Sequence, residues 1–477
     1  MTSQVFGNIA TTTPQQLFAQ LQQQQYSVAN TTAKTRIQKL KRLRNCILQH
    51  RTAIYDALFA DFKKSTTETD LTETLAVVAE INFAIRHLHA WTAKQAVNTP
   101  LKLIGTSSYI QYEPKGVVLI IAPWNFPINL LLSPLVSAVA AGNCVVLKPS
   151  EFAPHSAAVM KKIIAEVFDE NEVAFLEGDH TLAQQLLQLP FNHIFFTGSP
   201  QVGKIVMQAA AKNLTSITLE LGGKSPVIVD DTADLQEVAE KVGWVKCMNT
   251  GQICIAPDYL LISPHRLTAF LDILQKQIIR YYGKNPALSP DYPRIINAKH
   301  FQRIKQLLDD AVLKGANMIK SSDFNEADNY IPPIILTNVS ANMLIMQEEI
   351  FGPILPIMTI ENIEQAVRFI NQGEKPLALY IFSNDKKNTE FILQNTRSGN
   401  ACINECGTHF YNHYLPFGGV NNSGIGKAHG LNGFLEFSNA KGITKRSSKL
   451  IGLTKLVSPP YNRRVQTIVD IVLKWLA

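Results

Sequence analysis

The sequence predicts an α/β protein in which two domains are each built on a parallel sheet. Continuous apolar runs at residues 117–122 and 144–147 have the composition of strands buried on both faces, and an apolar helical segment at residues 128–141 connects them. A strand, a helix and a strand in this order form a βαβ unit, which implies a parallel sheet. The 477-residue chain exceeds the roughly 100–200 residues of one ordinary domain. We therefore expect two α/β domains.

The other elements follow from hydrophobic spacing. Apolar residues recur at helical spacing over residues 32–64 and 73–94, and alternation at residues 109–114 predicts an exposed strand between domains or subunits. The elements expected after residue 150 are helix 156–168, strand 173–176, helix 181–188, strand 193–196, helix 205–212, and strands 217–221 and 227–229, which begin the second series. A membrane span over residues 128–147 is the competing interpretation. Pro134 and Gly142 disfavour it, since a span needs ~20 mostly apolar residues in one continuous helix.

Composition excludes several function classes. The formal net charge of +7 permits an acidic ligand without demanding nucleic acid. The densest basic run, residues 39–44, has leucines at helical spacing and no interleaved aromatic residues, so we interpret it as the solvated face of a helix and expect no nucleic-acid partner. Six scattered cysteines fit a reducing compartment, and residues 1–30 carry no signal-peptide pattern. The expected location is the cytoplasm.

A glycine-rich turn follows the strand at residues 193–196. Gly198, Gly203 and Lys204 stand where a helix begins, and free backbone N–H groups at such a point can bind an anion. Ile205 occupies the position where a nucleotide-triphosphatase loop needs Ser or Thr for magnesium, and the spacing is not that of the standard dinucleotide fold. A tight turn without a ligand explains the same pattern.

Three residues flanked by Gly or Pro suggest chemistry on a carbonyl group. Cys254 lies in a turn, Glu220 ends an apolar strand directly before two glycines, and Asn125 lies between Trp124 and Phe126 in a proline-bounded turn. A thiol nucleophile, a carboxylate whose pKa is raised by burial, and an amide donor are the groups that thioester chemistry requires. The alternatives are a buried structural cysteine and an exposed glutamate at a strand end.

A zinc site is the alternative function for one cysteine- and histidine-containing segment. Cys402, Cys406, His409 and His413 offer thiol and imidazole ligands, but their spacing is short and non-standard, and Cys402 falls in a predicted strand. We expect no metal at this segment.

Taken together, the motifs resemble those of the NAD(P)-dependent aldehyde dehydrogenase superfamily over almost the whole chain. The matching blocks are Pro-Trp-Asn-Phe-Pro at 123–127, Lys-Pro-Ser-Glu at 148–151, Phe-Thr-Gly-Ser-x-x-Val-Gly at 196–203, Leu-Glu-Leu-Gly-Gly-Lys-Ser-Pro at 219–226, Gly-Gln-x-Cys at 251–254, Glu-Glu-Ile-Phe-Gly-Pro at 348–353 and Pro-Phe-Gly-Gly-Val-x-x-Ser-Gly-x-Gly at 416–426. The short polar start, the Ile-Ala-Pro-Asp-Tyr after Cys254 and the Pro-Pro-Tyr at 459–461 are similar to class 3 members.

The resemblance implies a domain division. Residues 1–100 and 115–220 would form an NAD-binding domain of Rossmann type, and residues 221–425 a catalytic domain of the same type. Residues 101–114 and 426–458 would form a small β element for oligomerisation, with a homodimer as the expected assembly. Residues 459–477 would be an amphipathic tail.

The resemblance also implies roles for the three candidate residues. Cys254 would attack the aldehyde, Asn125 and the Cys254 backbone N–H would stabilise the oxyanion, and Glu220 would activate water to hydrolyse the thioester. The acylating relatives generally lack this base, so the product would be a carboxylic acid. A catalytically inactive family member with a structural role, and a cofactor-independent esterase or thioesterase, are the alternatives.

By the same resemblance, the cofactor is NAD, with NADP as the alternative. The pyrophosphate would lie near Gly198, Ser199 and Gly203. The other expected contacts are Glu349 and Phe351 at the nicotinamide ribose and ring, Trp124 close by, and Lys148 and Glu151 at the adenosine ribose. A carboxylate at Glu151 would repel a 2′-phosphate. In class 3 members Asn404, His409 and His413 would lie near the substrate funnel without metal, and Cys247 would be a core residue.

The carboxyl-terminal segment has apolar residues on one helical face from Val465 to Leu476, including Trp475. It is too short to span a bilayer. Three positions are open for it: on a membrane surface, over the substrate tunnel, or docked on its own subunit or on a partner. The apolar tail and the class favour medium- to long-chain aliphatic or aromatic aldehydes, but no motif fixes the substrate.

Overall fold

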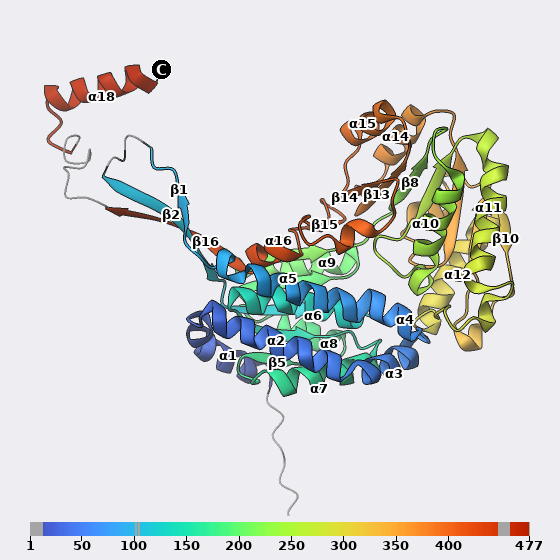
Figure 1. Cartoon of the computed structure of the whole chain (residues 1–477), viewed down its shortest axis with the longest axis horizontal. Coiled ribbons are helices and arrows are strands. Elements are labelled where there is room, and N and C mark those ends of the chain that lie inside the picture. The colour runs from blue at the N-terminus through green and yellow to red at the C-terminus, as the bar shows by residue number, and fades with distance from the viewer. Residues whose placement is uncertain (1–12, 101–102, 104, 447–457, 477) are drawn as a thin grey trace, which may run out of the picture.

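The computed structural model describes residues 13–100, 103, 105–446 and 458–476, and in it three sheets organise the chain (Figure 1). Two large sheets have helices on both faces, and a small antiparallel sheet projects from the first of them. The fold is that of an α/β protein with two largely parallel sheets and a small β element, as the sequence predicts.

The first sheet has six strands in the order β15-β7-β6-β3-β4-β5 and is parallel except for β15. Its strands are β3 (Val117–Ile121), β4 (Cys144–Lys148), β5 (Val173–Phe175), β6 (His193–Thr197), β7 (Ser216–Glu220) and β15 (Gly424–Ile425). Alternate residues of β3 enter different cores: Val118 and Ile120 pack on one face of the sheet, and Val117 and Leu119 on the other. This burial on both faces explains why the strand reads as a continuous apolar run.

Helices cover both faces of the first sheet. One face carries α2 (Ala33–Gln49), α3 (Arg51–Phe62), α5 (Leu75–Trp91), α6 (Pro127–Ala141) and α7 (Pro154–Val167), and the other carries α1 (Pro14–Ala29) and α9 (Pro200–Ala211). The short elements are α4 (Thr66–Thr69), the π-helical turn η1 (Asp70–Thr74), α8 (His180–Leu186) and α16 (Gly430–Glu436).

The second sheet has seven strands in the order β10-β11-β12-β9-β8-β13-β14, parallel except for β10. They are β8 (Pro226–Val229), β9 (Tyr259–Ile262), β10 (Asn317–Lys320), β11 (Ile334–Thr337), β12 (Ile354–Thr359), β13 (Ala378–Phe382) and β14 (Asn400–Ile403). Its helices are α10 (Leu235–Cys247), α11 (Pro264–Tyr282), α12 (Ala298–Leu313), α13 (Leu344–Gln347), α14 (Ile363–Gln372) and α15 (Lys386–Asn395). The turns Met248–Gly251, Pro286–Leu288, Glu326–Asp328 and Thr408–Tyr411 are 3-10 helical.

The third sheet joins β1 (Gln95–Val97), β2 (Thr106–Pro114) and β16 (Ser438–Arg446), all antiparallel. Beyond its tip lies α18 (Arg463–Leu476), on which Val465 is buried whereas Ile471 and Leu473 are more than half exposed (Figure 1). Residues 447–457 and the side chains of Trp475 and Leu476 lie outside the described residues. None of the helices in the described part of the chain is long and apolar enough to cross a membrane.

The structure corrects some predicted boundaries. The helical pattern at residues 32–64 belongs to two helices, because His50 ends α2 before α3 begins. Helix α9 begins at Pro200, five residues earlier than expected, because Ser199 caps it and Pro at the first helical position suits its fixed φ. The strand expected at 217–221 does not begin the second series: β7 pairs with β6 in the first sheet. Strand β15 also lies in the first sheet, although it falls inside the residues expected for the catalytic domain.

Candidate active site

The loop that carries Cys254 has an unusual backbone. Asn249, Thr250 and Gly251 have φ values of 49°, 50° and 71°, so three successive residues are left-handed. Such residues persist only where the surroundings hold them. The buried Gln252 side chain does so, because its Nε2 donates to the Arg294 carbonyl at 3.1 Å and its Oε1 accepts from the Ile296 amide at 3.0 Å.

Asn125 is tied to the same loop. Its Nδ2 donates to the Gln252 carbonyl at 2.9 Å, and the Asn249 Nδ2 donates in turn to the Asn125 carbonyl at 2.9 Å. An amide nitrogen has two hydrogens, so the bond to Gln252 orients the group and leaves one donor for a ligand. Asn125, the residue predicted as oxyanion donor, is therefore bonded to Gln252, which precedes Cys254 by two positions in the sequence.

Cys254 is half-buried, and its environment disfavours the thiolate. Burial raises the pKa of the Cys254 thiol well above its usual range, and the carboxylates of Glu349 and Glu220 act in the same direction. Backbone N–H groups of Cys254 and Ile255 oppose this shift. The free site thus holds a thiol, which needs a proton acceptor before it can act as a nucleophile.

Glu220 is the last residue of β7, and it is buried rather than exposed. Neither carboxylate oxygen has a hydrogen-bond partner among the described residues. Burial raises its pKa well above the usual value; Lys427 opposes the shift and Glu436 adds to it. This is the environment expected for a general base that works near neutral pH.

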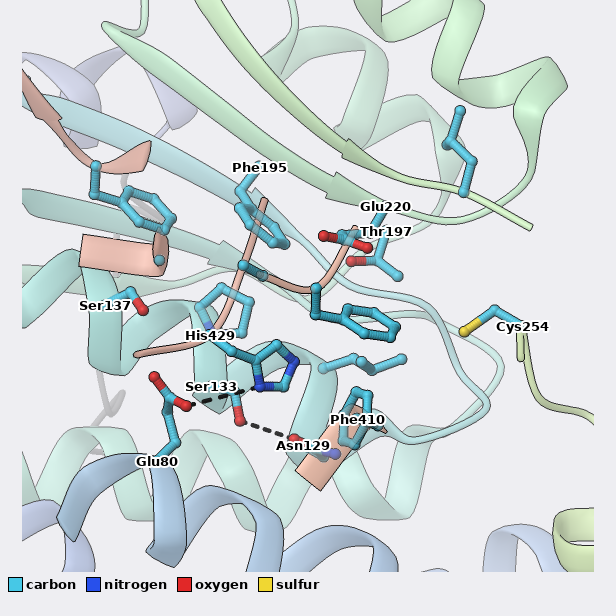
Figure 2. Close-up of a pocket in the computed structure, with 17 residues that line it drawn as sticks. Glu80, Asn129, Ser133, Ser137, Phe195, Thr197, Glu220, Cys254, Phe410 and His429 are labelled. Atoms are coloured by element: carbon cyan, nitrogen blue, oxygen red, sulfur yellow. Dashed lines mark hydrogen bonds and ion pairs between the residues drawn. The ribbon is translucent and has the colours of Figure 1, made fainter. Parts of the chain in front are cut away.

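Cys254 and Glu220 line one cavity (Figure 2). Much of its wall is apolar, formed by Leu130, Phe195, Leu221, Phe410, Phe417 and Phe437. Polar side chains gather on the side away from Cys254, where Figure 2 shows Glu80 and His429. The cavity suits an apolar molecule whose reactive carbon reaches the thiol.

The residues predicted for a pyrophosphate lie at the start of α9. Gly198 follows β6, its amide donates to the Glu220 carbonyl at 3.0 Å, and a Cβ on it would collide with the Phe196 ring. Ser199 caps the helix by accepting from the Val202 amide. Gly203 packs against Leu221, where a Cβ would come within 2.8 Å of the leucine side chain. Gly198 therefore allows the close approach of the Phe196 ring of β6, Gly203 allows α9 to pack closely on Leu221, and the helix end remains available to an anion.

The other residues predicted for the cofactor form two groups. At the end of β4, Lys148 Nζ donates to Glu151 Oε2 at 2.8 Å. Phe351 lies edge-on to Trp124, with ring centroids 5.4 Å apart, and has a left-handed φ of 48°. Glu349 Oε1 is buried without a partner, and burial raises the pKa of this carboxyl to about 8. An unpaired buried acceptor fits a ligand that donates hydroxyl groups, as a ribose does.

The residues considered for zinc separate into two places. Cys402 Sγ lies 3.0 Å from His409 Nδ1, whereas His413 Nδ1 lies 3.0 Å from Glu80 Oε2. Asn404 is absent from the cavity wall and instead bonds the backbone of Ser383 through both ends of its amide. Cys247 is 2% exposed, so its predicted place in the core is confirmed.

Several residues of the site escaped the sequence reasoning. Asn249 and Gln252 hold the thiol loop, Lys427 lies near Glu220, and Glu80 and His429 line the cavity. Gln252 lies within the motif that contains Cys254, so its place in the sequence was a usable signal. Glu80 sits in an ordinary helical pattern, and no spacing connects it to His429, which is 349 residues further along the chain.

The fold agrees with the comparisons to known proteins. A model described as the aldehyde dehydrogenase family matches residues 2–443. The chain therefore belongs to the aldehyde dehydrogenase family, and it is an aldehyde dehydrogenase.

Its relatives place it near family 3. The 4,4'-diaponeurosporen-aldehyde dehydrogenase of Staphylococcus aureus is 42% identical over 433 residues, which cover 91% of this chain and 93% of the relative. Human aldehyde dehydrogenase family 3 member B1 is 44% identical, with 91% of each chain covered. A solved structure of S. aureus AldH in a substrate-bound state is 40% identical and covers 97% of this chain and all of its own, with a TM-score of 0.93. The predicted resemblance to class 3 is confirmed.

Proposed function

We propose that this enzyme oxidises an aldehyde to the carboxylic acid through a thioester on Cys254, with NAD as the oxidant. The observation that carries the proposal is the convergence of three groups: the Cys254 thiol and the Glu220 carboxylate on one cavity, and the Asn125 amide bonded to the loop of the thiol. Each group matches one need of the reaction, namely a nucleophile, a base and an oxyanion donor.

The first half-reaction begins at Cys254. Its thiol gives its proton to Glu220, which releases it to water, and the sulfur adds to the aldehyde carbon. The carbonyl oxygen gains the charge that the free Asn125 N–H and the Cys254 backbone N–H stabilise. One such donor contributes about 3–4 kcal/mol to the transition state. A nicotinamide cofactor supplies the acceptor for the hydride that leaves this carbon. Water then adds to the thioester, Glu220 takes a proton from that water, and the C–S bond breaks to return sulfur to Cys254.

The residues for the cofactor fit a dinucleotide. The capped start of α9 at Ser199 offers N–H groups to a pyrophosphate. The unpaired Glu349 Oε1 can accept from a ribose hydroxyl. Glu151 is paired with Lys148 at the end of β4, and its carboxylate accepts hydroxyl bonds but repels a 2′-phosphate. These features favour NAD over NADP.

The wall of the cavity supports a proposal for the substrate class. Its aromatic and aliphatic wall favours medium- to long-chain aliphatic or aromatic aldehydes. A relative named for 4,4'-diaponeurosporen-aldehyde accords with this class. The assembly is a homodimer formed through the sheet of β1, β2 and β16, and α18 contacts either a partner or a membrane surface through its exposed apolar residues.

The test is NADH formation across aldehydes of graded length and ring content, with wild type and Cys254→Ala. We expect wild type to reduce NAD with apolar aldehydes and Cys254→Ala to be inactive. A Cys254→Ala enzyme that still reduces NAD would disprove the thioester route. Product release without NAD would indicate an esterase, and wild type inactive with every aldehyde would indicate a structural role.

A further inference from the structure

Helices α2 and α7 pack against each other on the first sheet, and three metal-ligating side chains meet near their ends (Figure 1). Cys46 lies in the last turn of α2, His50 directly follows that helix, and Glu166 lies in the last turn of α7. A thiol sulfur, an imidazole nitrogen and a carboxylate oxygen of these residues all lie within 4.8 Å of one another. The proposed thioester route does not use these three residues.

The ligand atoms have nearly the spacing that zinc requires. Cys46 Sγ lies 3.3 Å from Glu166 Oε2, and His50 Nε2 lies 3.0 Å from both oxygens of Glu166. In a tetrahedral site with Zn–S of ~2.3 Å and Zn–N and Zn–O of ~2.0–2.1 Å, the ligand atoms stand about 3.3–3.6 Å apart. The side chains of His50 and Glu166 are 16% and 43% exposed, so small rotations can bring the three atoms to this spacing.

The local sequence explains why the thiol and the imidazole converge. Cys46 and His50 are four positions apart, and residues at this spacing lie on the same side of a helix. Pairs of metal ligands at this spacing recur in zinc sites. Cys46 is 5% exposed and its sulfur lies 3.9 Å from the Ile163 carbonyl, so the thiol is fixed at the base of the cluster. The other two ligands reach solvent, from which an ion can enter.

The charges of the cluster can neutralise a divalent ion. Burial raises the pKa of the Cys46 thiol to about 11, and the hydrogen bond and charge of Glu166 act in the same direction. Without metal, the thiol therefore keeps its proton and donates it to the Glu166 carboxylate at 3.3 Å. The cations Lys162 and Arg42 also face the sulfur and favour its thiolate. A thiolate and a carboxylate together carry two negative charges, so bound Zn²⁺ adds no net charge beside these cations.

The types of ligand select the ion. Magnesium and calcium are bound by oxygen ligands, whereas a thiolate with an imidazole suits zinc and other borderline-soft ions. The ligands must lose their protons to bind, so the affinity for zinc falls as the pH is lowered.

We propose that Cys46, His50 and Glu166 bind one Zn²⁺ ion, with water as the fourth ligand, and that the ion ties the end of α2 to α7. The S–H bond of Cys46 breaks, its proton goes to the buffer, and the electron pair of the sulfur forms the Zn–S bond. The His50 nitrogen and one Glu166 oxygen donate lone pairs to the ion. Nothing is oxidised or reduced, and the site is independent of the thioester route.

The test uses the full chain with Cys254→Ala as the parent, so that the active-site thiol cannot bind the probe. The EDTA-treated protein is dialysed against zinc chloride, and its zinc content is measured by elemental analysis. We expect one zinc per parent chain. Cys46→Ser, His50→Ala and Glu166→Gln should each weaken binding by at least the ~10–100-fold that loss of an outer-shell partner costs.

Cobalt in place of zinc identifies the sulfur ligand. The parent should show the charge-transfer absorption of a cobalt–thiolate bond, and Cys46→Ser should lose it. Zinc should also raise the melting temperature of the parent but not that of Glu166→Gln, because an ion that binds only the folded state stabilises it. Metal-free Glu166→Gln should melt near the metal-free parent, since this side chain is partly exposed and Gln keeps its shape.

Glu172→Gln is the matched control. It removes a carboxylate that pairs with Lys39 of α2 but lies outside the cluster, so this variant should bind zinc as the parent does. No zinc uptake by the parent overturns the inference, and so does uptake that all three cluster variants retain. Zinc that is lost only in Glu80→Gln, without a thiolate band, would place the ion at Glu80, His413 and His429 and equally overturn it. Wild-type activity with aldehydes is a separate readout, so failure of the proposed function is distinguishable.

Discussion

Replacement of Asn125 by Ala isolates the oxyanion donor from the structural role of the residue. The Asn125 Nδ2 bond to the Gln252 carbonyl disappears, but Asn249 Nδ2 still donates to that carbonyl at 3.3 Å. No buried acceptor is left unpaired, so the stability cost should be about 1 kcal/mol, the net contribution of one hydrogen bond. Loss of one oxyanion donor should lower the rate of hydride transfer by about 10²–10³-fold, or about 3–4 kcal/mol.

The assay is stopped-flow NADH formation in a single turnover, beside thermal unfolding and the rate of Cys254 alkylation by iodoacetamide. Alkylation creates no oxyanion, so that rate should stay near wild type. Asn143→Ala is the control, since Asn143 is buried, bonds the Ala138 and Phe437 carbonyls and the Gly116 amide, and does not itself line the cavity. It should lose at least as much stability without the kinetic loss. A hydride-transfer rate of Asn125→Ala within about fivefold of wild type would refute the assigned donor.

Three further predictions concern the carboxyl groups of Glu349 and Glu151 and the carboxyl-terminal helix α18. Folding raises the pKa of Glu349 from 4.5 to about 8, because burial disfavours the charged carboxylate. The protonated carboxyl therefore adds stability to the folded state, and this contribution is complete below pH 4.5. It is lost as the pH rises toward and through about 8. The melting temperature of Glu349→Gln relative to wild type should therefore rise between pH 5 and pH 9, and a constant difference would contradict this. Glu151→Gln should raise the NADP to NAD ratio of kcat/KM, and an unchanged ratio would contradict the 2′-phosphate argument. Deletion of residues 462–477 should alter long-chain aldehyde kinetics, liposome binding or dimer mass by light scattering; no change in any of them would exclude a role for α18.

The chain order of apolar runs was enough to predict the architecture. Val117–Ile121 is apolar at every position because both faces of the strand are buried, and this property is visible without coordinates. The motif around Cys254 and the Gly-Gly after Glu220 likewise predicted the reactive groups of the proposed mechanism, because thioester chemistry needs a thiol and a base with a shaped backbone nearby. Element ends such as that of α9 were less accurate, since a cap and a proline, rather than apolar spacing, set where the helix begins.

Only the tertiary structure decided what surrounds these groups. Glu220 is buried without a partner because β7 ends inside the molecule, a condition that its sequence neighbours leave open. Gln252 holds the thiol loop through hydrogen bonds to the backbone of residues 294 and 296. Glu80 contacts His413 and His429, which lie more than 330 positions later in the sequence. Sequence periodicity reports which face of an element is buried. It does not report which distant side chain meets that face, because long-range contacts depend on how the sheets and loops pack.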